Sequence, residues 1–287
     1  MTRLAAIPSE LMIDAGLAKA MLVTMIREEV HKVGFKRVIF GLSGGIDSAL
    51  AAALAAEALG PENVKGIVMP YKSSSPESLA DAGLVAEKLG IESVVVDITQ
   101  QVDAYFENST TPGSEDQKIW NLRRGNKMAR ERMTILYDRS MVDNSLVLGT
   151  SNKTELLLGY GTLYGDMASA VNPLGDLYKT QVWQLAAALD LPEKVIEKPP
   201  TADLWSGQSD EAEIGYSYVE IDRIFYYLVD HRMTQARLVR MGFNTDLVEA
   251  LSKLLRRSQY KRCLPVVAKL GRRTIDRDFR YPRDWGY

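Results

Sequence analysis

The first 150 residues of the chain contain four short apolar runs that lack the polar alternation of a half-exposed strand. These runs lie at 38–40, 67–69, 94–96 and 146–148. Aliphatic and β-branched residues without alternation are typical of strands buried on both faces of a parallel sheet. Helical patterns separate the runs and lie at 48–59, 76–89 and 118–139. This alternation predicts an α/β fold with a doubly wound parallel sheet.

A helix is also expected before the first strand, because apolar residues recur there at spacings of three and four. These residues are Leu11, Ala15, Ala18, Leu22 and Met25. Beyond Gly175 the strand pattern fades, and helical patterns lie at 180–189, 219–230 and 245–256. Among them, the polar segment 199–215 has the length and composition of a lid loop. Because no linker divides the sequence, we expect one domain over 1–287 with a helical C-terminal part.

Composition and charge narrow the possible partners. The chain has 287 residues, of which 46% are hydrophobic and 25% charged, a balance that excludes a disordered or collagen-like chain. Its net charge is −2, so no overall positive field attracts nucleic acid or an anionic membrane. No apolar run approaches the ~18 residues of a membrane span. We therefore expect no nucleic-acid or membrane partner, although the arginines of the C-terminal tail leave RNA contact open as an alternative.

The content of cysteine and histidine excludes several kinds of site. Cys263 is the only cysteine, and the two histidines are His31 and His231. This set cannot form an internal disulfide or a zinc cluster, and it disfavours a histidine-based catalytic triad. We expect a reducing, cytoplasmic setting and a small buried side chain at Cys263. The chemistry should then depend on carboxylates, lysines and backbone groups.

The string GLSGGIDSA directly follows the first predicted strand and begins the next predicted helix. In an open parallel sheet, ligands bind at the carboxyl ends of the strands. Gly44 and Gly45 let the backbone approach an anion closely, while Ser43, Ser48 and the N–H groups of the helix start offer hydrogen-bond donors. Phosphate is the natural occupant. Asp47 beside a phosphate indicates a magnesium ion between them, because the two anions would otherwise repel each other.

This string resembles the signature of the ATP pyrophosphatase family, whose Ser-Gly-Gly-x-Asp-Ser loop grips the pyrophosphate end of ATP. Three further strings follow it: GNKMARERM, GTSNKTELLLGYGTLYGDMASAVNPLGDLYKTQ and KPPTADLWSGQSDEAEIG. Together the four strings resemble the ammonia-dependent NAD synthetases over most of 36–262. The resemblance implies an adenine-nucleotide hydrolase-like fold, a homodimer, and amidation of deamido-NAD in two steps. ATP adenylates the nicotinate carboxylate and releases pyrophosphate, and ammonia then displaces AMP.

The resemblance also implies roles for individual residues. The contacts to ATP that it implies are Ser43, Gly44, Gly45, Ile46, Asp47, Ser48, Thr150, Lys179 and Thr201. The contacts to deamido-NAD are Arg130, Tyr260 and Lys261. Asp47 and Glu155 match the magnesium ligands, and Asp166 matches the acidic residue that positions ammonium and takes its proton.

Three positions depart from the pattern of many family members. Leu163 and Ala170 stand where those members carry a lysine and an aspartate, and Tyr260 stands where a histidine is common. These differences leave open the contacts to deamido-NAD at the three positions and the binding mode of its pyridine end. The sequence TLYGDMA at this place instead resembles the synthetase half of the glutamine-dependent enzymes. We expect the chain itself to use free ammonia, because Cys263 is the only thiol and no pattern places a base beside it.

Other functions remain possible from the sequence. One is another ATP pyrophosphatase, such as a GMP synthetase-like amidase or a tRNA thiolase, although a thiolase would be expected to carry more cysteines. The other is an ATP-binding module without catalysis. Such a module has no need for the acidic residues Glu155 and Asp166 near a phosphate loop.

Overall fold

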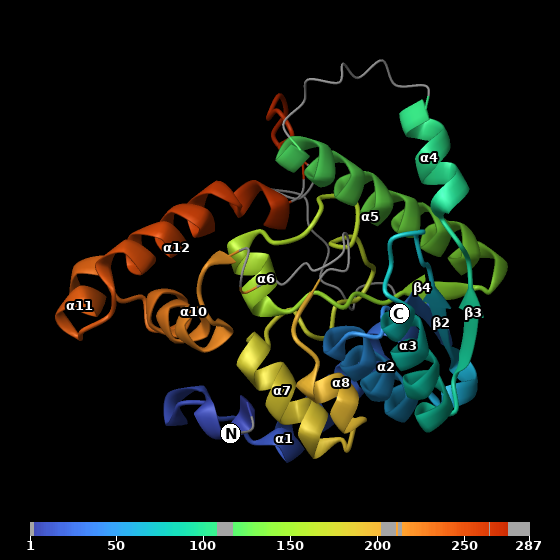
Figure 1. Ribbon diagram of the computed structural model, residues 1–287, viewed down its shortest axis with the longest axis horizontal. Helices are drawn as coiled ribbons and strands as arrows, with labels where there is room; N and C mark the ends of the chain where they lie inside the picture. The colour runs from blue at the N-terminus through green and yellow to red at the C-terminus, as the bar shows by residue number, and fades with distance from the viewer. Residues whose placement is uncertain (1–2, 108–116, 202–210, 212–213, 264, 275–287) are drawn as a thin grey trace.

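The computed structural model describes residues 3–107, 117–201, 211, 214–263 and 265–274 and has a parallel sheet at its centre (Figure 1). Its four strands are β1 (Arg37–Gly41), β2 (Val64–Val68), β3 (Glu92–Val95) and β4 (Ser145–Val147). They pair in the order β3-β2-β1-β4, and every pairing is parallel. The four apolar runs are therefore confirmed as strands, although β2 begins and ends before the predicted 67–69.

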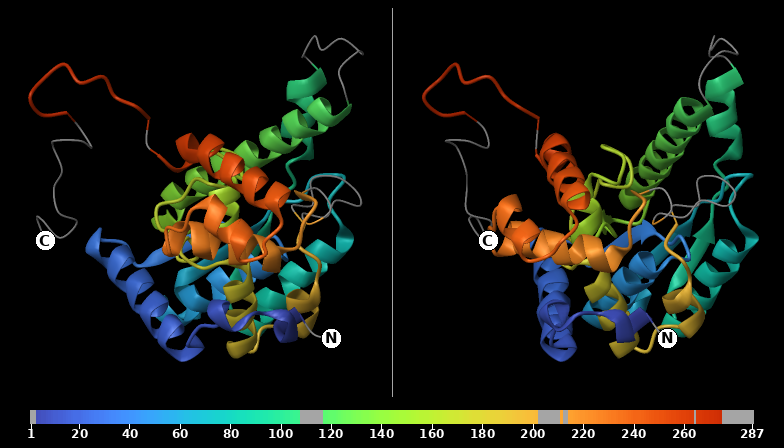
Figure 2. Two further views of the ribbon diagram at one scale, coloured as in Figure 1. Left: turned by 90° about the vertical axis from the view of Figure 1, so that its left-hand side faces the viewer. Right: turned by 60° about the vertical axis from the view of Figure 1, so that its left-hand side comes forward.

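Helices cover both faces of the sheet, as a doubly wound fold requires. One face, formed by Val38 and Phe40, packs against four helices: α1 (Ala15–Lys32), α2 (Ile46–Leu59), α3 (Pro76–Leu89) and α7 (Lys179–Ala188). The other face, formed by Ile39 and Ile67, packs against α4 (Thr99–Glu107) and α5 (Gln117–Val142). Figure 2 shows α4 and the start of α5 standing out from the body of the molecule.

A second hydrophobic core holds the C-terminal helices beside the sheet. Its elements are α6 (Lys153–Leu158), α10 (Tyr218–Phe225), a π-helix η4 (Tyr226–Asp230), α11 (Gln235–Arg240) and α12 (Thr245–Arg257). The remaining short elements are α8 (Glu193–Glu197) and the 3-10 turns η1 (Arg3–Ala6), η2 (Ser9–Leu11), η3 (Pro61–Asn63) and η5 (Gln259–Arg262). The expected helical C-terminal part is confirmed over the described residues.

The N-terminal helix differs from its prediction. It begins only at Ala15, because the Asp14 carboxylate caps it by accepting a hydrogen bond from Leu17 N at 2.9 Å. Its buried residues are Val23, Ile26 and Val30, which were not in the predicted set. Of the predicted residues, Ala15, Leu22 and Met25 are partly buried and pack against the same core. Leu11 is fully buried, but it lies in η2 and packs into the C-terminal core.

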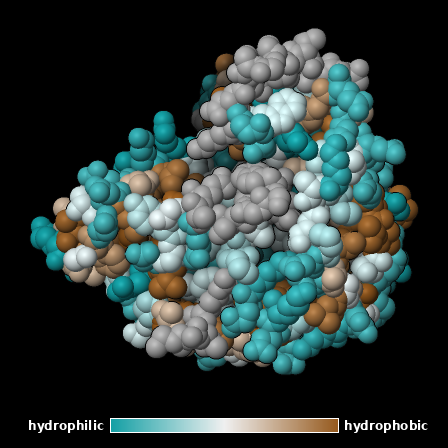
Figure 3. Space-filling model, viewed as in Figure 1, coloured by the Kyte–Doolittle hydropathy of each residue, from teal (hydrophilic) through white to brown (hydrophobic). Residues whose placement is uncertain are grey.

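One strand also differs from the expectation of burial on both faces. β3 is an edge strand, and three of its four residues are exposed, including Val95 at 57%. Figure 3 shows hydrophobic surface near this edge and near α11, with hydrophilic residues between them. No helix in the described part of the chain is long and apolar enough to cross a membrane.

Candidate active site

A cavity of about 730 Å³ opens at the carboxyl ends of the strands. It collects residues from all four strings singled out in the sequence. The predicted site residues that line it are Ser43, Gly45, Ile46, Asp47, Ser48, Arg130, Thr150, Glu155, Asp166, Lys179, Thr201, Tyr260 and Lys261. The volume falls within the range of roughly 300–1,000 Å³ that is usual for ligand sites. A nucleotide-sized ligand therefore has room among these side chains.

At Gly44, the loop between β1 and α2 has a backbone conformation that only glycine adopts readily. Its φ is +76°, and a Cβ built there would lie 2.2 Å from the carbonyl oxygen of Ser78 and 3.1 Å from Ala82 N. Gly44 thus lies directly against the backbone of α3. This close contact fixes the position of the loop relative to α3.

The hydroxyl groups of Ser43 and Ser48 form hydrogen bonds within the same loop. Ser48 Oγ donates to the carbonyl of Gly45 at 2.9 Å and accepts from Ser43 N at 3.2 Å. Ser43 Oγ accepts from Gly45 N at 3.2 Å. No described side chain caps the N-terminus of α2, whose cap residue is Gly45. The helix start therefore presents backbone N–H groups and its positive dipole end to the cavity, an arrangement that favours an anion.

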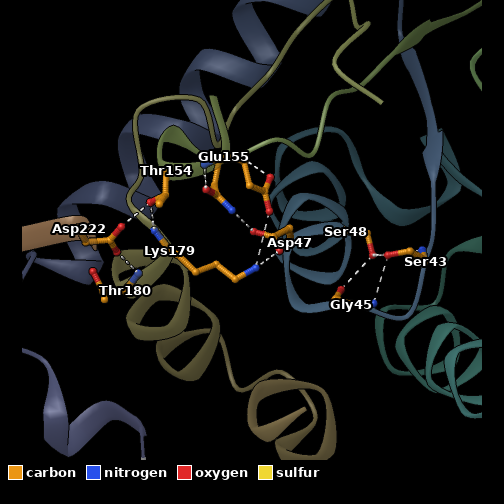
Figure 4. Close-up of polar contacts among 10 residues, drawn as sticks. Ser43, Gly45, Asp47, Ser48, Thr154, Glu155, Lys179, Thr180 and Asp222 are labelled. Carbon is orange, nitrogen blue, oxygen red and sulfur yellow. Dashed lines mark hydrogen bonds and ion pairs between the residues drawn. The ribbon is translucent and has the colours of Figure 1, made fainter. Parts of the chain in front are cut away.

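A cluster of charges lies beside the loop (Figure 4). The ammonium of Lys179 makes an ion pair with Asp47 Oδ2 and lies 3.9 Å from Glu155 Oε1. The side chain of Asn152 donates to Asp47 Oδ1 at 2.9 Å, and its backbone N–H donates to Glu155 Oε2 at 3.2 Å. The two carboxylates predicted to bind magnesium thus point toward one positive centre, although they come from different elements.

The buried carboxylate of Asp222 connects two of the helices that carry this cluster, α6 and α7. Asp222 of α10 is fully buried, accepts from Thr154 Oγ1 at 2.5 Å and accepts from Thr180 N at 2.8 Å (Figure 4). Thr154 Oγ1 in turn accepts from Lys179 N at 2.9 Å. Burial raises the pKa of Asp222 to about 6, although both threonines favour its charged form. The starts of α6 and α7 are therefore joined through one side chain.

Asp166 lies on a turn at another wall of the cavity. Its Oδ1 accepts from Thr162 N at 2.8 Å. The residue is exposed and lines the cavity, and desolvation by the nearby protein atoms raises the pKa of its carboxyl group. Lys261 lies close by and donates to the carbonyls of Gly159 and Gly161, both at 2.7 Å. Burial lowers the pKa of the Lys261 ammonium. Lys261 thus supports the turn in addition to lining the cavity.

Arg130 and Leu163 are neighbours at the mouth of the cavity. Arg130 is exposed, and its Nε donates to the Leu163 carbonyl at 3.2 Å. Leu163 lines the cavity with an apolar side chain, whereas Ala170 is an exposed residue outside the lining. Tyr260 is 63% exposed at the rim. The wall next to Arg130 therefore includes an apolar residue, Leu163.

One expectation about the C-terminal half is wrong, and two others fall mostly on residues that the structure does not describe. Cys263 is exposed, not buried, because it follows the last 3-10 turn at the point where the chain leaves the C-terminal core. Most of the predicted lid at 199–215 lies outside the described residues, as does the arginine-rich tail after 274.

Sequence reasoning missed several residues that shape the site. Asn152 is the N-cap of α6 and forms a capping box with Glu155. The spacing of Asn and Glu was a recognisable sign of that helix start. Asp222, Asp81 and Lys198 had no comparable sign, because their partners lie far away in the sequence.

Comparison with known proteins gives one family. The family model described as NAD synthase matches residues 19–265. The NH(3)-dependent NAD(+) synthetase of Trichlorobacter lovleyi is 58% identical over 278 residues, which cover 97% of this chain and 99% of that protein. The protein of the same name from Chlorobium phaeobacteroides is 52% identical over 95% of this chain and 96% of its own length.

Solved structures agree with the fold. The NH3-dependent NAD synthetase of Campylobacter jejuni matches with a TM-score of 0.75 at 34% identity. The match covers 90% of this chain and 100% of the Campylobacter jejuni chain. The NMN synthetase of Francisella tularensis has a TM-score of 0.78 at 30% identity, covering 90% of this chain and 99% of its own. A glutamine-dependent NAD+ synthetase from Acinetobacter baumannii matches with a TM-score of 0.66 at 33% identity over 95% of this chain and 50% of its own.

Proposed function

Because this chain belongs to the NAD synthase family, we propose that it amidates deamido-NAD with ammonia and ATP in the cavity described above. The observation that supports this site best is the convergence of four distant strings on one cavity. The loop after β1 offers an anion site, and charged groups for ATP and for ammonium lie around it. An ATP-binding module without catalysis would have no use for Asp166 in the same cavity.

The loop and Lys179 are proposed to hold the phosphates of ATP. The N–H groups at the start of α2 and the Ser43 and Ser48 hydroxyls suit phosphate oxygens. Lys179 is almost fully buried, so its charge acts through little intervening water. These groups would stabilise the charge that builds up on the pyrophosphate as the carboxylate of deamido-NAD attacks the α-phosphate. Thr150 and Thr201 complete the proposed contacts to ATP.

Asp47 and Glu155 fit a magnesium ion. Their oxygens already face a common cation, the ammonium of Lys179. Among the described residues, no group of three or more acidic, histidine or cysteine side chains gathers. Magnesium does not need such a group, because it usually takes one or two carboxylates together with phosphate oxygens and water. When bound, the ion would neutralise negative charge on the phosphates.

Asp166 is proposed as the residue that receives ammonium and takes its proton. Asp166 lines the cavity, and its raised pKa makes it a stronger base than an aspartate with an ordinary pKa. Ammonia could then attack the adenylated carboxylate, and AMP would leave with the bridging oxygen. Arg130, Tyr260 and Lys261 form the wall where deamido-NAD is proposed to bind.

The remaining proposals concern the whole chain. We propose that residues 1–287 act as one domain, that the enzyme is a cytoplasmic homodimer, and that deamido-NAD binds near the contact between subunits. Size-exclusion chromatography with light scattering would test the dimer, since the proposal requires twice the chain mass of 32.0 kDa.

Product analysis with competing acceptors tests the activity itself. The enzyme receives ATP, magnesium and ammonium together with deamido-NAD, nicotinate mononucleotide or xanthosine monophosphate, each in a separate reaction. We expect NAD, AMP and pyrophosphate with deamido-NAD, at a kcat/KM well above that for the other acceptors. A preference for nicotinate mononucleotide would place the chain with the NMN synthetase that it resembles in fold, and a preference for xanthosine monophosphate would contradict the proposed substrate class.

A further inference from the structure

A nearly buried carboxylate outside the predicted site connects the phosphate loop with the chain after α8. Asp81 of α3 is 1% exposed and forms ion pairs with two lysines. Its Oδ1 lies 2.8 Å from Lys194 Nζ, and its Oδ2 lies 2.8 Å from Lys198 Nζ. Although burial alone would raise it, these ammonium groups hold the pKa of Asp81 below its ordinary value. Asp81 is therefore a charged anchor for both lysines.

The two lysines face different surroundings. Lys194 is 59% exposed and does not belong to the described lining of the cavity. Lys198 is 17% exposed, lines the cavity, and donates to Ser78 Oγ at 3.2 Å. Of the two lysines only Lys198 lines the ligand site, although both hold the same carboxylate.

Ser78 brings Lys198 close to the phosphate loop. The carbonyl of Ser78 lies directly against Gly44, which explains why that position cannot hold a Cβ. The hydroxyl of the same residue accepts the hydrogen bond from Lys198. The Lys198 ammonium is therefore separated from the loop by a single residue of α3, on the side opposite to Lys179 and α7.

The charged groups differ between these two sides of the loop. On the α7 side, the ammonium of Lys179 faces the carboxylates of Asp47 and Glu155. On the α3 side, Asp81 pairs with Lys194 and Lys198, and Glu77 also acts electrostatically on Lys194. Of these two lysines only Lys198 lines the cavity, so it is the cation on this side that suits a phosphate group there.

We propose that Lys198, held in place by its ion pair with Asp81, is a pyrophosphate-binding residue of this enzyme. The proposal rests on the proposed function, because it assumes that ATP occupies the cavity with its β- and γ-phosphates at the loop. Lys198 precedes Thr201, a proposed ATP contact that lines the same cavity, by three positions. It would stabilise the leaving pyrophosphate from the side opposite to Lys179.

Direct binding of inorganic pyrophosphate tests this role, with Lys194 as a matched control. Calorimetric titration with magnesium pyrophosphate compares the wild type with Lys198→Met, Lys198→Arg and Lys194→Met. We expect Lys198→Met to weaken binding at least about tenfold, and Lys198→Arg to recover part of the loss, because a charged contact is removed and restored. Lys194→Met should stay within about twofold of wild type, since Lys194 is largely exposed and does not line the cavity.

Two results would overturn the proposal. One is unchanged pyrophosphate binding in Lys198→Met, and the other is an equal loss in Lys194→Met, which would mean that both lysines act only by holding Asp81. Thermal unfolding of both methionine variants shows whether either loses the fold. The KM for ATP should rise in Lys198→Met while the KM for deamido-NAD stays level. Failure of the proposed function is a separate result, because it would appear as a wild type that makes no NAD.

Discussion

At the scale of single residues, Gly44→Ala tests the tight contact between the phosphate loop and α3. A Cβ at this position would lie 2.2 Å from the Ser78 carbonyl oxygen, at a φ of +76°. We expect a loss of about 1–3 kcal/mol in the free energy of unfolding and a higher KM for ATP. Urea unfolding and steady-state kinetics measure both effects. Gly83→Ala is the matched control on α3, since nothing lies within 4 Å of a Cβ there. Equal behaviour of the two variants would show that the contact does not constrain the loop.

The residues of the phosphate loop were predictable from the sequence, whereas the residues that support it were not. Ser43, Gly44 and Asp47 stand within one short string, so their chemistry is visible in local spacing. Asp222 gave no sign of its role, because its partner Thr154 lies 68 positions away. Which distant residues meet depends on the packing of α10 against α6 and α7, which no local pattern encodes.

Asp222→Asn tests the buried carboxylate through the pH dependence of stability. The pKa of Asp222 is raised from 3.8 in the unfolded chain to about 6 in the fold. Its contribution to stability is therefore fully present below pH 4 and is lost as the pH rises to 6. Relative to Asp222→Asn, the wild type should lose up to about 3 kcal/mol across this window and change little above it. A stability difference that stays constant with pH would contradict the raised pKa.

At the scale of elements, the sequence predicted helices best where their ends carry caps. α3 begins at Pro76 after a Ser75 cap and ends at Leu89 before the C-cap residue Gly90 with φ +65°, in agreement with the predicted bounds. The exposure of β3 was not predictable, because the same apolar run suits a central or an edge strand. α6 has only six residues, too few for a periodic pattern, and the helix depends on its contacts.

Thr154→Val should separate α6 from α7 at the site. The substitution keeps the shape of the side chain but removes the hydroxyl that donates to Asp222 and accepts from Lys179 N. We expect a loss of about 1–3 kcal/mol in stability, because buried polar groups lose their partners. We also expect a lower kcat, because Lys179 and Glu155 shift relative to each other. Thr154→Ser keeps the hydroxyl and should restore kcat. Full activity of Thr154→Val at a temperature where it is folded would show that this bond does not position the site.

At the scale of the whole molecule, alternating helices and strands predicted the doubly wound sheet. The order β3-β2-β1-β4 was not part of that prediction, because strand runs do not reveal which strands pair. The second core was also hidden. Leu11, near the start of the chain, packs with helices more than 200 positions later, such as α12 (Thr245–Arg257). Its contribution to the fold appears only when the two ends of the chain are seen together.

The source of nitrogen is also a property of the whole chain. Cys263 is exposed, and its described neighbour within hydrogen-bond range is Gln259, whose Nε2 lies 3.6 Å from the sulfur. An amide donor cannot activate a thiol as a base would. We expect Cys263→Ser to keep full ammonium-dependent activity, and purified wild type to make negligible NAD from glutamine in a coupled assay. Glutamine-dependent synthesis that Cys263→Ser abolishes, while ammonium-dependent synthesis survives, would contradict this expectation.

The central claim is that the cavity beside the phosphate loop activates a carboxylate by adenylation before ammonia attacks. Deamido-NAD labelled with 18O in both oxygens of its nicotinate carboxylate tests this claim most directly. In a single reaction with ATP, magnesium and ammonium, one labelled oxygen should leave with AMP and the other should remain in the amide of NAD. Mass spectrometry of the two products measures both. AMP without label, or label appearing in a terminal phosphate of ADP or inorganic phosphate, would contradict adenylation.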